Sequence, residues 1–368
     1  MRREQELEEI RVRKAERRGS PEEFYRFLEE RERILFVVND HTRPTPTRKI
    51  LESAKEYLEG KDISFLIATG THRSPTQKEI EEILGDFKKY PVYIHDAKNS
   101  SFIHCGKTSR GTPVYLNKIV LEHPCVVNIT SVEPHYFAGI TGGRKSYIPG
   151  ISAYETIEKN HSLAMEPEAL PLKLEGNPVH EDMVEGVKLA GKEFFSLNLV
   201  QWEKEVVGYF FGECLSSLSG AYELAKRIYL FEMEKVDAVI AEVYPPLSKN
   251  LYQAHKGIEN VKEIVRDGGV ILLVADLEEG TGPSHFYDML KERRLPEKYC
   301  LGMHKAKRMM DLMKRVEIWC VSSMGDRLKE IGFVPFPGLE DALEELFKRY
   351  SKILRVRDAG RIVVMPHM

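Results

Sequence analysis

The sequence predicts an α/β protein with two α/β domains and a ligand cleft between them. Short apolar runs alternate with stretches that favour helix, which is the pattern of a sheet covered by helices on both faces. This pattern restarts near Val236, and a length of 368 residues suits about two domains. We therefore expect an N-terminal domain over residues 1–230 and a C-terminal domain over residues 231–368.

The first elements are expected in the N-terminal domain. Residues 1–19 are mostly charged, which predicts a solvated helix or a frayed arm. A helix should start between Ser20 and Glu23, because serine can cap it, proline suits its first turn and Glu23 completes a capping box. The elements expected next are strand 34–38, helix 47–58, strand 63–68, helix 75–84, and strands 92–94, 114–119 and 125–129.

The C-terminal domain repeats the alternation of strand and helix. The elements expected there are strand 236–243, helix 249–266, strands 270–277 and 316–321, helix 339–350 and strand 362–365.

Composition excludes several classes of protein. The chain has 54 Lys+Arg against 57 Asp+Glu, which argues against a dedicated nucleic-acid binder. The N-terminus is charged and unlike a signal peptide, and the apolar runs are too short to span a bilayer. The five cysteines form no Cys-x-x-Cys pair. We expect a cytoplasmic protein with neither a nucleic-acid nor a membrane partner.

Polar residues follow the ends of four predicted strands, at residues 40–43, 69–72, 131–135 and 244–256. Ligands of open α/β sheets bind at the carboxyl ends of the strands. The fourth group lies in the other domain, so a cleft between domains would let all four converge.

Two of these groups carry a histidine, His72 and His135. Each could be an ordinary loop histidine, or a general base near neutral pH. Two histidines at the ends of neighbouring strands can flank one substrate from opposite sides. A racemase needs that geometry, because it must act on both faces of a planar intermediate.

Two further groups could bind a carboxylate. Arg43 could hold one bidentately, with Asp40 orienting a histidine or the arginine, although both could also belong to a solvated turn. Gln253 and Lys256 lie on one face of a predicted helix and could clamp a hydroxy-carboxylate from the far side. An ordinary polar helix face is the alternative for that pair.

The segment 134–150 reads as a cofactor platform. It combines His135 with a glycine-rich bend, an Arg-Lys pair and a closing Pro-Gly turn. Glycines allow a close backbone approach to a ligand, and Lys145 could meet a phosphate or bond covalently to a cofactor. Thr69 could contact a phosphate as well. A later histidine, His161, could bind a metal.

Together these motifs resemble the nickel-dependent lactate racemase family. Asp-x-Thr-Arg-Pro, Gly-x-His, the His-x9-Lys span around Gly-Gly-Arg-Lys, a later His and Gln-x-x-Lys occur in that order. The resemblance covers roughly residues 30–365. It implies a racemase or epimerase of lactate or a related 2-hydroxy acid. It also implies reversible hydride transfer to a nickel-pincer nucleotide, which dedicated cofactor-synthesis proteins would supply.

The resemblance implies roles for particular residues. His72 and His135 would be paired bases, Lys145 would hold the cofactor through a thioamide bond, and His161 would be the protein ligand to nickel. The remaining implied residues are Asp40, Arg43, Tyr252, Gln253 and Lys256 for the substrate and Thr69, Gly142, Gly143 and Arg144 for the cofactor.

Three alternative functions fit the sequence less well. A non-catalytic protein that binds or stores the nickel cofactor would need only Lys145 and His161, so His72 and His135 argue against it. An NAD-dependent dehydrogenase would need Gly-x-Gly-x-x-Gly after a strand, and the glycines from Gly139 have another spacing. A phosphate-binding loop would need the P-loop motif Gly-x-x-x-x-Gly-Lys-Ser/Thr, which the chain lacks.

Overall fold

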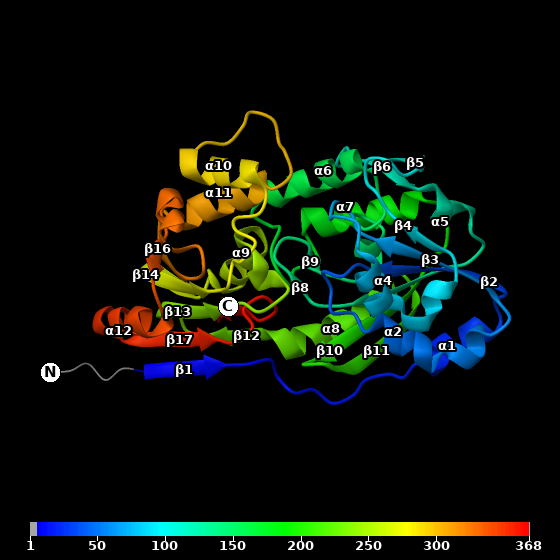
Figure 1. Ribbon diagram of the computed structural model, residues 1–368, viewed down its shortest axis with the longest axis horizontal. Coiled ribbons are helices and arrows are strands. Elements are labelled where there is room, and N and C mark those ends of the chain that lie inside the picture. Colours follow the sequence, from blue (N-terminus) through cyan, green and yellow to red (C-terminus); the bar gives the residue numbers. More distant parts are fainter. Residues whose placement is uncertain (1–5, 368) are drawn as a thin grey trace. The chain divides into compact units, whose positions relative to one another are not determined.

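The chain forms two compact units that each contain a six-stranded sheet (Figure 1). The computed structural model describes residues 6–367. The N-terminal unit consists of Lys14–Glu133 and Phe137–Arg227. The C-terminal unit consists of the chain from Ile228 onward, the described residues up to Arg13, and Pro134–Tyr136. The α/β class predicted from the sequence is confirmed.

The sheet of the N-terminal unit has the strand order β11-β10-β7-β2-β3-β4. Its strands are β2 (Arg33–Asn39), β3 (Asp62–Ala68), β4 (Val92–Ile94), β7 (Val126–Ser131), β10 (Phe195–Trp202) and β11 (Glu205–Glu213). All neighbours are parallel except β10 and β11. The chain runs from β2 to β3 on one side and returns to β7 on the other. The strand order therefore reverses between β2 and β7, where doubly wound sheets bind ligands.

Helices cover one face of this sheet and bury an apolar core. They are α1 (Glu22–Glu29), α2 (Thr47–Ser53), α3 (Lys55–Leu58) and α4 (Gln77–Leu84). Phe24, Ile50 and Ile80 from these helices join Phe36 and Phe65 of the sheet in one buried cluster. Burial of this apolar surface is the main force that holds the layer in place.

The rest of the N-terminal unit builds on the opposite face and the edges. Its elements are β5 (Phe102–Lys107), β6 (Pro113–Asn117), α5 (Lys118–Glu122), β9 (Gly139–Ile140), α6 (Tyr154–Ser162), α7 (Pro178–Leu189) and α8 (Ser217–Tyr229), with short 3₁₀ turns at Gly143–Ser146 and Leu163–Met165. The 3₁₀ turn Gly85–Lys89 belongs instead to the first face, where Phe87 joins the buried cluster. Asn128 of β7 donates hydrogen bonds to Ser146 Oγ (2.8 Å) and to the Gly143 carbonyl (3.4 Å). The segment around Lys145 therefore lies against this second face of the sheet.

The C-terminal unit has an all-parallel sheet of order β1-β17-β13-β14-β15-β16. Its strands are β1 (Glu6–Ile10), β13 (Val236–Glu242), β14 (Val265–Val274), β15 (Glu317–Val321), β16 (Val334–Phe336) and β17 (Lys352–Val356), with β8 (Pro134–His135) and the parallel pair β12 (Leu230–Met233) and β18 (Val363–Pro366) outside it. Its helices are α9 (Leu251–Val261), α10 (Ser284–Glu292), α11 (Met303–Leu312) and α12 (Leu339–Arg349), with 3₁₀ turns at Leu247–Lys249 and Gly325–Ile331. Leu346 of α12 packs on Ile240, Leu272 and Trp319 to form its core.

Residues 6–10 correct the prediction of a helix or frayed arm. They form the edge strand β1, which pairs in parallel with β17 from Glu6↔Lys352 to Ile10↔Val356. Ile10 is buried, whereas Leu7 is 48% exposed. An edge strand tolerates charged residues, because their side chains can reach water. Residues 1–5 lie outside the described part of the chain.

Most predicted elements are confirmed, but several boundaries are wrong. The helix expected over 47–58 breaks at Ala54, and α1 begins at Glu22 without a side-chain cap from Ser20. The helix expected over 249–266 ends at Val261, because the chain enters β14 at Val265. Helix ends depend on tertiary packing, which local patterns do not contain.

Candidate functional site

The loops after β2 and β3 leave the sheet side by side. The last residues of these strands, Asn39 and Ala68, are partners in the ladder. Asp40 and Thr69, which follow them, therefore start at the same edge of the sheet. The sequence predicts both groups at this edge, and the structure confirms that position.

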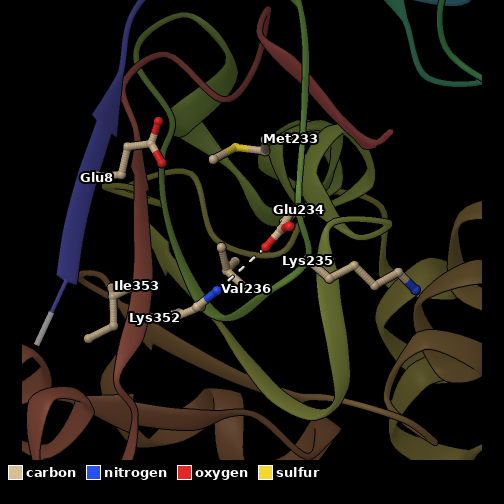
Figure 2. Close-up of a pocket in the computed structure, with 7 residues that line it drawn as sticks. All are labelled: Glu8, Met233, Glu234, Lys235, Val236, Lys352 and Ile353. Carbon is tan, nitrogen blue, oxygen red and sulfur yellow. Dashed lines mark ion pairs between the residues drawn. The ribbon is translucent and has the colours of Figure 1, made fainter. Parts of the chain in front are cut away.

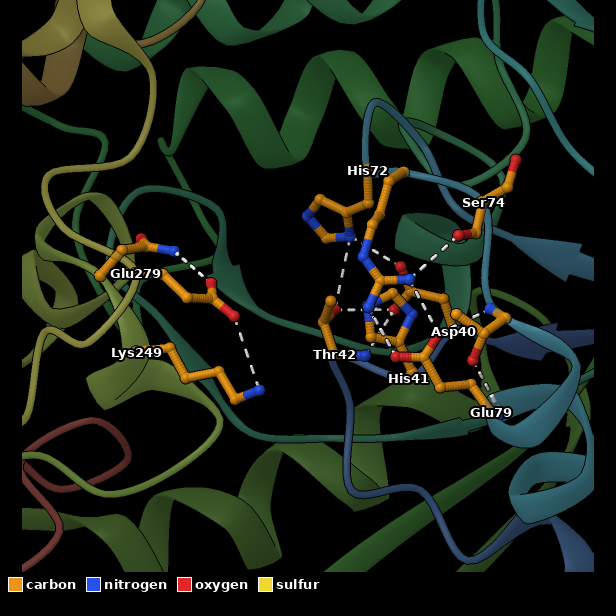
Figure 3. Close-up of polar contacts among 11 residues, drawn as sticks. Asp40, His41, Thr42, His72, Ser74, Glu79, Lys249 and Glu279 are labelled. Carbon is orange, nitrogen blue, oxygen red and sulfur yellow. Dashed lines mark hydrogen bonds and ion pairs between the residues drawn. The ribbon is translucent and has the colours of Figure 1, made fainter.

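Asp40 and His72 form a hydrogen-bonded dyad at this edge (Figure 3). His72 Nδ1 lies 2.7 Å from Asp40 Oδ2. Asp40 Oδ1 accepts hydrogen bonds from the backbone N–H (3.1 Å) and hydroxyl (2.7 Å) of Thr42. The side chain of Asp40 is only 3% exposed, whereas that of His72 is 40% exposed. The carboxylate is thus a buried support, and the imidazole is the group that reaches outward.

The protonation of this dyad follows from its contacts. Burial alone would raise the pKa of Asp40, but the hydrogen bond and charge of His72, with Thr42 and Arg43, lower it below its usual value. An ionised carboxylate only accepts hydrogen bonds, so His72 Nδ1 must carry the proton. In the neutral ring, His72 Nε2 then has a free lone pair and can act as a base.

Arg43 lies on the same turn and is half-buried. Within residues 6–367 no ion pair or hydrogen bond is formed by its side chain. Thr45 holds this turn in place through hydroxyl hydrogen bonds to Asn39 Oδ1 (2.8 Å) and Ser131 Oγ (2.6 Å). The turn after β2 is therefore tied to the end of β7 and presents unused guanidinium donors.

The Lys145 loop is built on glycines that pack against the protein itself. Gly142 has φ 85° and Gly143 has φ 45°, both in the left-handed region. A Cβ on Gly142 would lie 2.5 Å from Val132 Cγ2, and one on Gly143 would lie 2.8 Å from the Cys214 carbonyl. These glycines are thus required for the close approach of the loop to the sheet.

The Lys145 loop also touches the loop that carries His72. The backbone N–H of Gly70 donates to the Gly150 carbonyl at 2.9 Å, and the N–H of Gly150 donates to the Lys145 carbonyl at 3.2 Å. Lys145 itself is half-buried. Two of the sequence-predicted groups are therefore joined by backbone hydrogen bonds.

Arg144 and Thr69 direct their polar groups into the fold. The buried guanidinium of Arg144 donates to backbone carbonyls and, through Nε, to His180 Nδ1 (3.0 Å). Burial lowers the pKa of Arg144 to about 10. The Thr69 hydroxyl donates to the His95 carbonyl at 2.6 Å.

His161 lies in the last turn of α6 and is half-buried. Its ring meets the ring of Phe137 edge-on, with centroids 5.0 Å apart. The segment from Phe137 through Lys145 to His161 therefore folds back on itself.

His135 belongs to the C-terminal unit together with Tyr136. His135 is 6% exposed and its ring stacks on that of Tyr136. The Tyr136 hydroxyl lies 2.9 Å from His304 Nε2, and Tyr299 lies 2.7 Å from His304 Nδ1. No local pattern in the sequence links His304 to residue 136, so this contact could not be predicted.

Tyr252, Gln253 and Lys256 lie on α9 of the same unit. The Oε1 atom of Gln253 is buried and accepts no hydrogen bond in the described part of the chain. Lys305, another residue missed from the sequence, donates to the Tyr252 carbonyl at 2.5 Å and lies 3.6 Å from the centre of the Tyr252 ring. A buried amide oxygen without a hydrogen-bond donor is unusual, and it is expected where a residue binds a polar ligand.

A pocket of about 240 Å³ lies elsewhere in the C-terminal unit (Figure 2). It is found at the amino-terminal ends of β13 and β17, beside an ion pair of Lys352 with Glu234 at 3.5 Å. None of the candidate residues lines it.

Over the residues described, no cluster of three or more His, Cys, Asp or Glu side chains is arranged to hold a metal ion. Nor does any helix in residues 6–367 have the length and apolarity to cross a membrane.

Family models match both parts of the chain. The model of the lactate racemase N-terminal domain matches residues 3–170, and that of the lactate racemase C-terminal domain matches residues 232–330. The chain belongs to the lactate racemase family.

Individual members of the family agree with this assignment. Lactate racemase from Thermoanaerobacterium thermosaccharolyticum is 31% identical over 73% of this chain, and that from Lactiplantibacillus plantarum is 30% identical over 72%. The matched region spans 66% and 65% of those two proteins, slightly less than two thirds of their length.

Solved structures show the same fold. The lactate racemase apoprotein from T. thermosaccharolyticum superimposes with a TM-score of 0.85 at 27% identity, covering 99% of this chain and 95% of that one. A protein from Thermotoga maritima superimposes with a TM-score of 0.76 at 17% identity, covering 95% of this chain and 98% of that one.

Proposed function

We propose that this protein is an isomerase that interconverts the two stereoisomers at C2 of lactate or a related 2-hydroxy acid. Membership of the lactate racemase family supports the reaction class. The observation that carries the proposal is the dyad of buried Asp40 and outward-facing His72. It provides an oriented base at the edge of the sheet where ligands of this fold bind.

In the proposed reaction, His72 Nε2 takes the proton of the substrate hydroxyl. Asp40 holds the ring in the required tautomer and stabilises the imidazolium that forms. The pKa of Asp40 is lowered, so it stays ionised and does not take the proton itself. Deprotonation of the hydroxyl makes departure of the C2 hydrogen as hydride easier, because the developing carbonyl is then neutral.

His135 is the proposed second base, acting on the opposite stereoisomer. Arg43 would bind the substrate carboxylate bidentately, because its donors have no other acceptor within residues 6–367. Gln253 and Lys256, with Tyr252 beside them, would bind the remaining polar groups of the substrate. Fixing the substrate in this way keeps its reacting atoms in near-attack geometry.

Lys145 and His161 are the proposed attachment points of a nickel-pincer nucleotide. The contact of Phe137 with His161 and the folded loop around Lys145 fit a ligand held at both residues. A neutral imidazole suits nickel. Gly142, Gly143, Arg144 and Thr69 would shape the surrounding loops. When bound, the nucleotide would supply a reversible acceptor for the substrate hydride.

Protein produced together with the cofactor-synthesis proteins is expected to racemise L- and D-lactate without added NAD. With 2-deuterated lactate, most of the deuterium should remain on C2 of the product, because a hydrogen that moves as hydride does not exchange with water. The measurement is chiral chromatography combined with mass spectrometry. Other 2-hydroxy acids, including sugar acids, should be tested in parallel.

Two outcomes would contradict this proposal. Loss of most deuterium to water would indicate a carbanion rather than hydride transfer. Absence of racemisation with every 2-hydroxy acid, in protein whose intact mass shows bound cofactor, would instead favour cofactor binding or storage.

Replacing Asp40 by Asn is expected to lower racemisation by about 10²-fold. The Asn amide would donate to His72 Nδ1, so the proton would move to Nε2 and block the base. The fold should survive, because one oxygen remains for Thr42. His41→Gln is a matched control on the same turn, since His41 contacts Glu79 (3.8 Å) and not His72. Equal activity of the D40N variant and the control would exclude the orienting role.

A further inference from the structure

Helix α7 carries none of the proposed catalytic or cofactor-binding residues, yet it contacts both segments that bear the attachment points. It runs from Pro178 to Leu189. Two groups of its contacts reach these segments, one with the Lys145 loop and one with α6.

The first group holds the Lys145 loop. At the N-cap of α7, the Asn177 side chain donates to the Phe137 carbonyl at 3.0 Å. One turn later, His180 Nδ1 accepts the hydrogen bond of Arg144 Nε at 3.0 Å. Farther along, a Cβ on Gly186 would lie 2.4 Å from Ile148 Cδ1, so the helix packs closely on the end of the loop.

Arg144 connects α7 to the backbone of the Lys145 loop. Its terminal nitrogens donate to the carbonyls of residues 138, 140, 141 and 142, at 2.8, 3.0, 3.3 and 3.2 Å. Both terminal nitrogens thus hold the turn that precedes Lys145, and Nε ties the guanidinium to α7. Burial and the neighbouring Arg144 charge lower the pKa of His180 to about 3, so its ring is neutral at physiological pH and can accept this bond.

The second group holds α6. Asp182 is 1% exposed, and its Oδ2 atom accepts a hydrogen bond from Asn160 Nδ2 at 2.8 Å. Asn160 precedes His161 directly. Asp182 also accepts hydrogen bonds from the hydroxyls of Thr108 (2.5 Å) and Thr112 (2.8 Å). This buried carboxylate is fully hydrogen-bonded and fixes the last turn of α6.

We propose that α7 sets the position of Lys145 relative to His161, with His180 and Asp182 as positioning residues that act through Arg144 and Asn160. The proposal rests on the proposed function in that both attachment points serve one cofactor. In this proposal Arg144 holds the loop that carries Lys145 and does not bind the cofactor directly. Its donors fix the loop, so that the amine of Lys145 is presented in one orientation.

The two connections can be broken separately. His180→Ala removes the acceptor for Arg144, and Asp182→Ala removes the acceptor for Asn160. His180→Asn and Asp182→Asn are conservative counterparts. Asn places an oxygen near the position of His Nδ1, and the Thr108 hydroxyl can turn to accept the new amide. Lys188→Gln, at an exposed site of the same helix, is the control.

Hydrogen exchange of the cofactor-free protein tests the positioning without reference to function. His180→Ala should speed exchange of amides 142–150 by about tenfold, the equivalent of one lost buried hydrogen bond. Asp182→Ala should do the same for residues 157–163. The Asn variants and Lys188→Gln should stay close to wild type. Exchange equal to the control, or spread evenly over the whole chain, would overturn the proposal.

Cofactor loading tests the consequence, through intact mass and nickel content after co-production with the synthesis proteins. His180→Ala should reduce the fraction of chains modified at Lys145 several-fold, whereas Asp182→Ala should keep that modification and reduce nickel per modified chain several-fold. Identical losses in both variants would overturn the proposal. If wild type carries no modification, the proposed function fails, and the exchange data still decide the role of α7.

Discussion

Replacing His72 or His135 by Ala is expected to lower racemisation by ~10²–10⁴-fold for each variant, starting from either stereoisomer. Each histidine is the base for one isomer and the acid for the other, so loss of either affects both directions. Initial rates with pure L- and pure D-substrate, followed by chiral chromatography, give the measurement.

The structure supplies a control for this experiment. His41 is on the same turn as Asp40 but contacts Glu79, so His41→Ala should retain most of the activity. Both histidine variants should retain the cofactor mass, because neither residue is proposed to bind it. A variant that lost only one direction, or neither, would contradict the two-base scheme.

Replacing Lys145 by Ala is expected to abolish covalent cofactor attachment and with it all racemisation. A guanidinium cannot replace the amine in a thioamide bond, so Lys145→Arg should fail equally although its charge is kept. The intact mass of purified protein after co-production with the synthesis proteins measures the attachment directly.

A control variant and a variant of the second attachment point complete this test. Lys159→Arg, at an exposed site of α6, should leave the mass of the modified protein unchanged apart from the substitution. His161→Ala should keep the organic modification but bind nickel weakly, because the imidazole is a separate ligand. Wild-type nickel content in the His161→Ala variant would rule out His161 as the metal ligand.

The sheet edge of the N-terminal unit could be predicted because its signals are local. The strands that precede Asp40 and Thr69 are continuous apolar runs bounded by polar residues, and β2 and β3 match them closely. Parallel strands place their following loops at one edge, so topology alone brings Asp40 and His72 together. The sequence also allowed Asp40 to orient a histidine, which is the arrangement found.

Contacts between distant parts of the chain could not be predicted. The bond between Tyr136 and His304 joins residues 168 positions apart, and Lys305 meets Tyr252 across 53 positions. That the Arg144 side chain points into the fold could not be predicted either. A Gly-Gly-Arg-Lys motif does not indicate which backbone carbonyls the arginine side chain will contact.

The pairing of β1 with β17 makes completion of the C-terminal sheet wait for the synthesis of residues 352–356. Residues 6–10 leave the ribosome well before their partners at 352–356. At usual elongation rates the strand waits roughly 20–70 s for its partner, during which the N-terminal unit can fold. Glu8, Glu9 and Arg11 place charges along and beside this waiting strand, which protects it from pairing with other nascent chains.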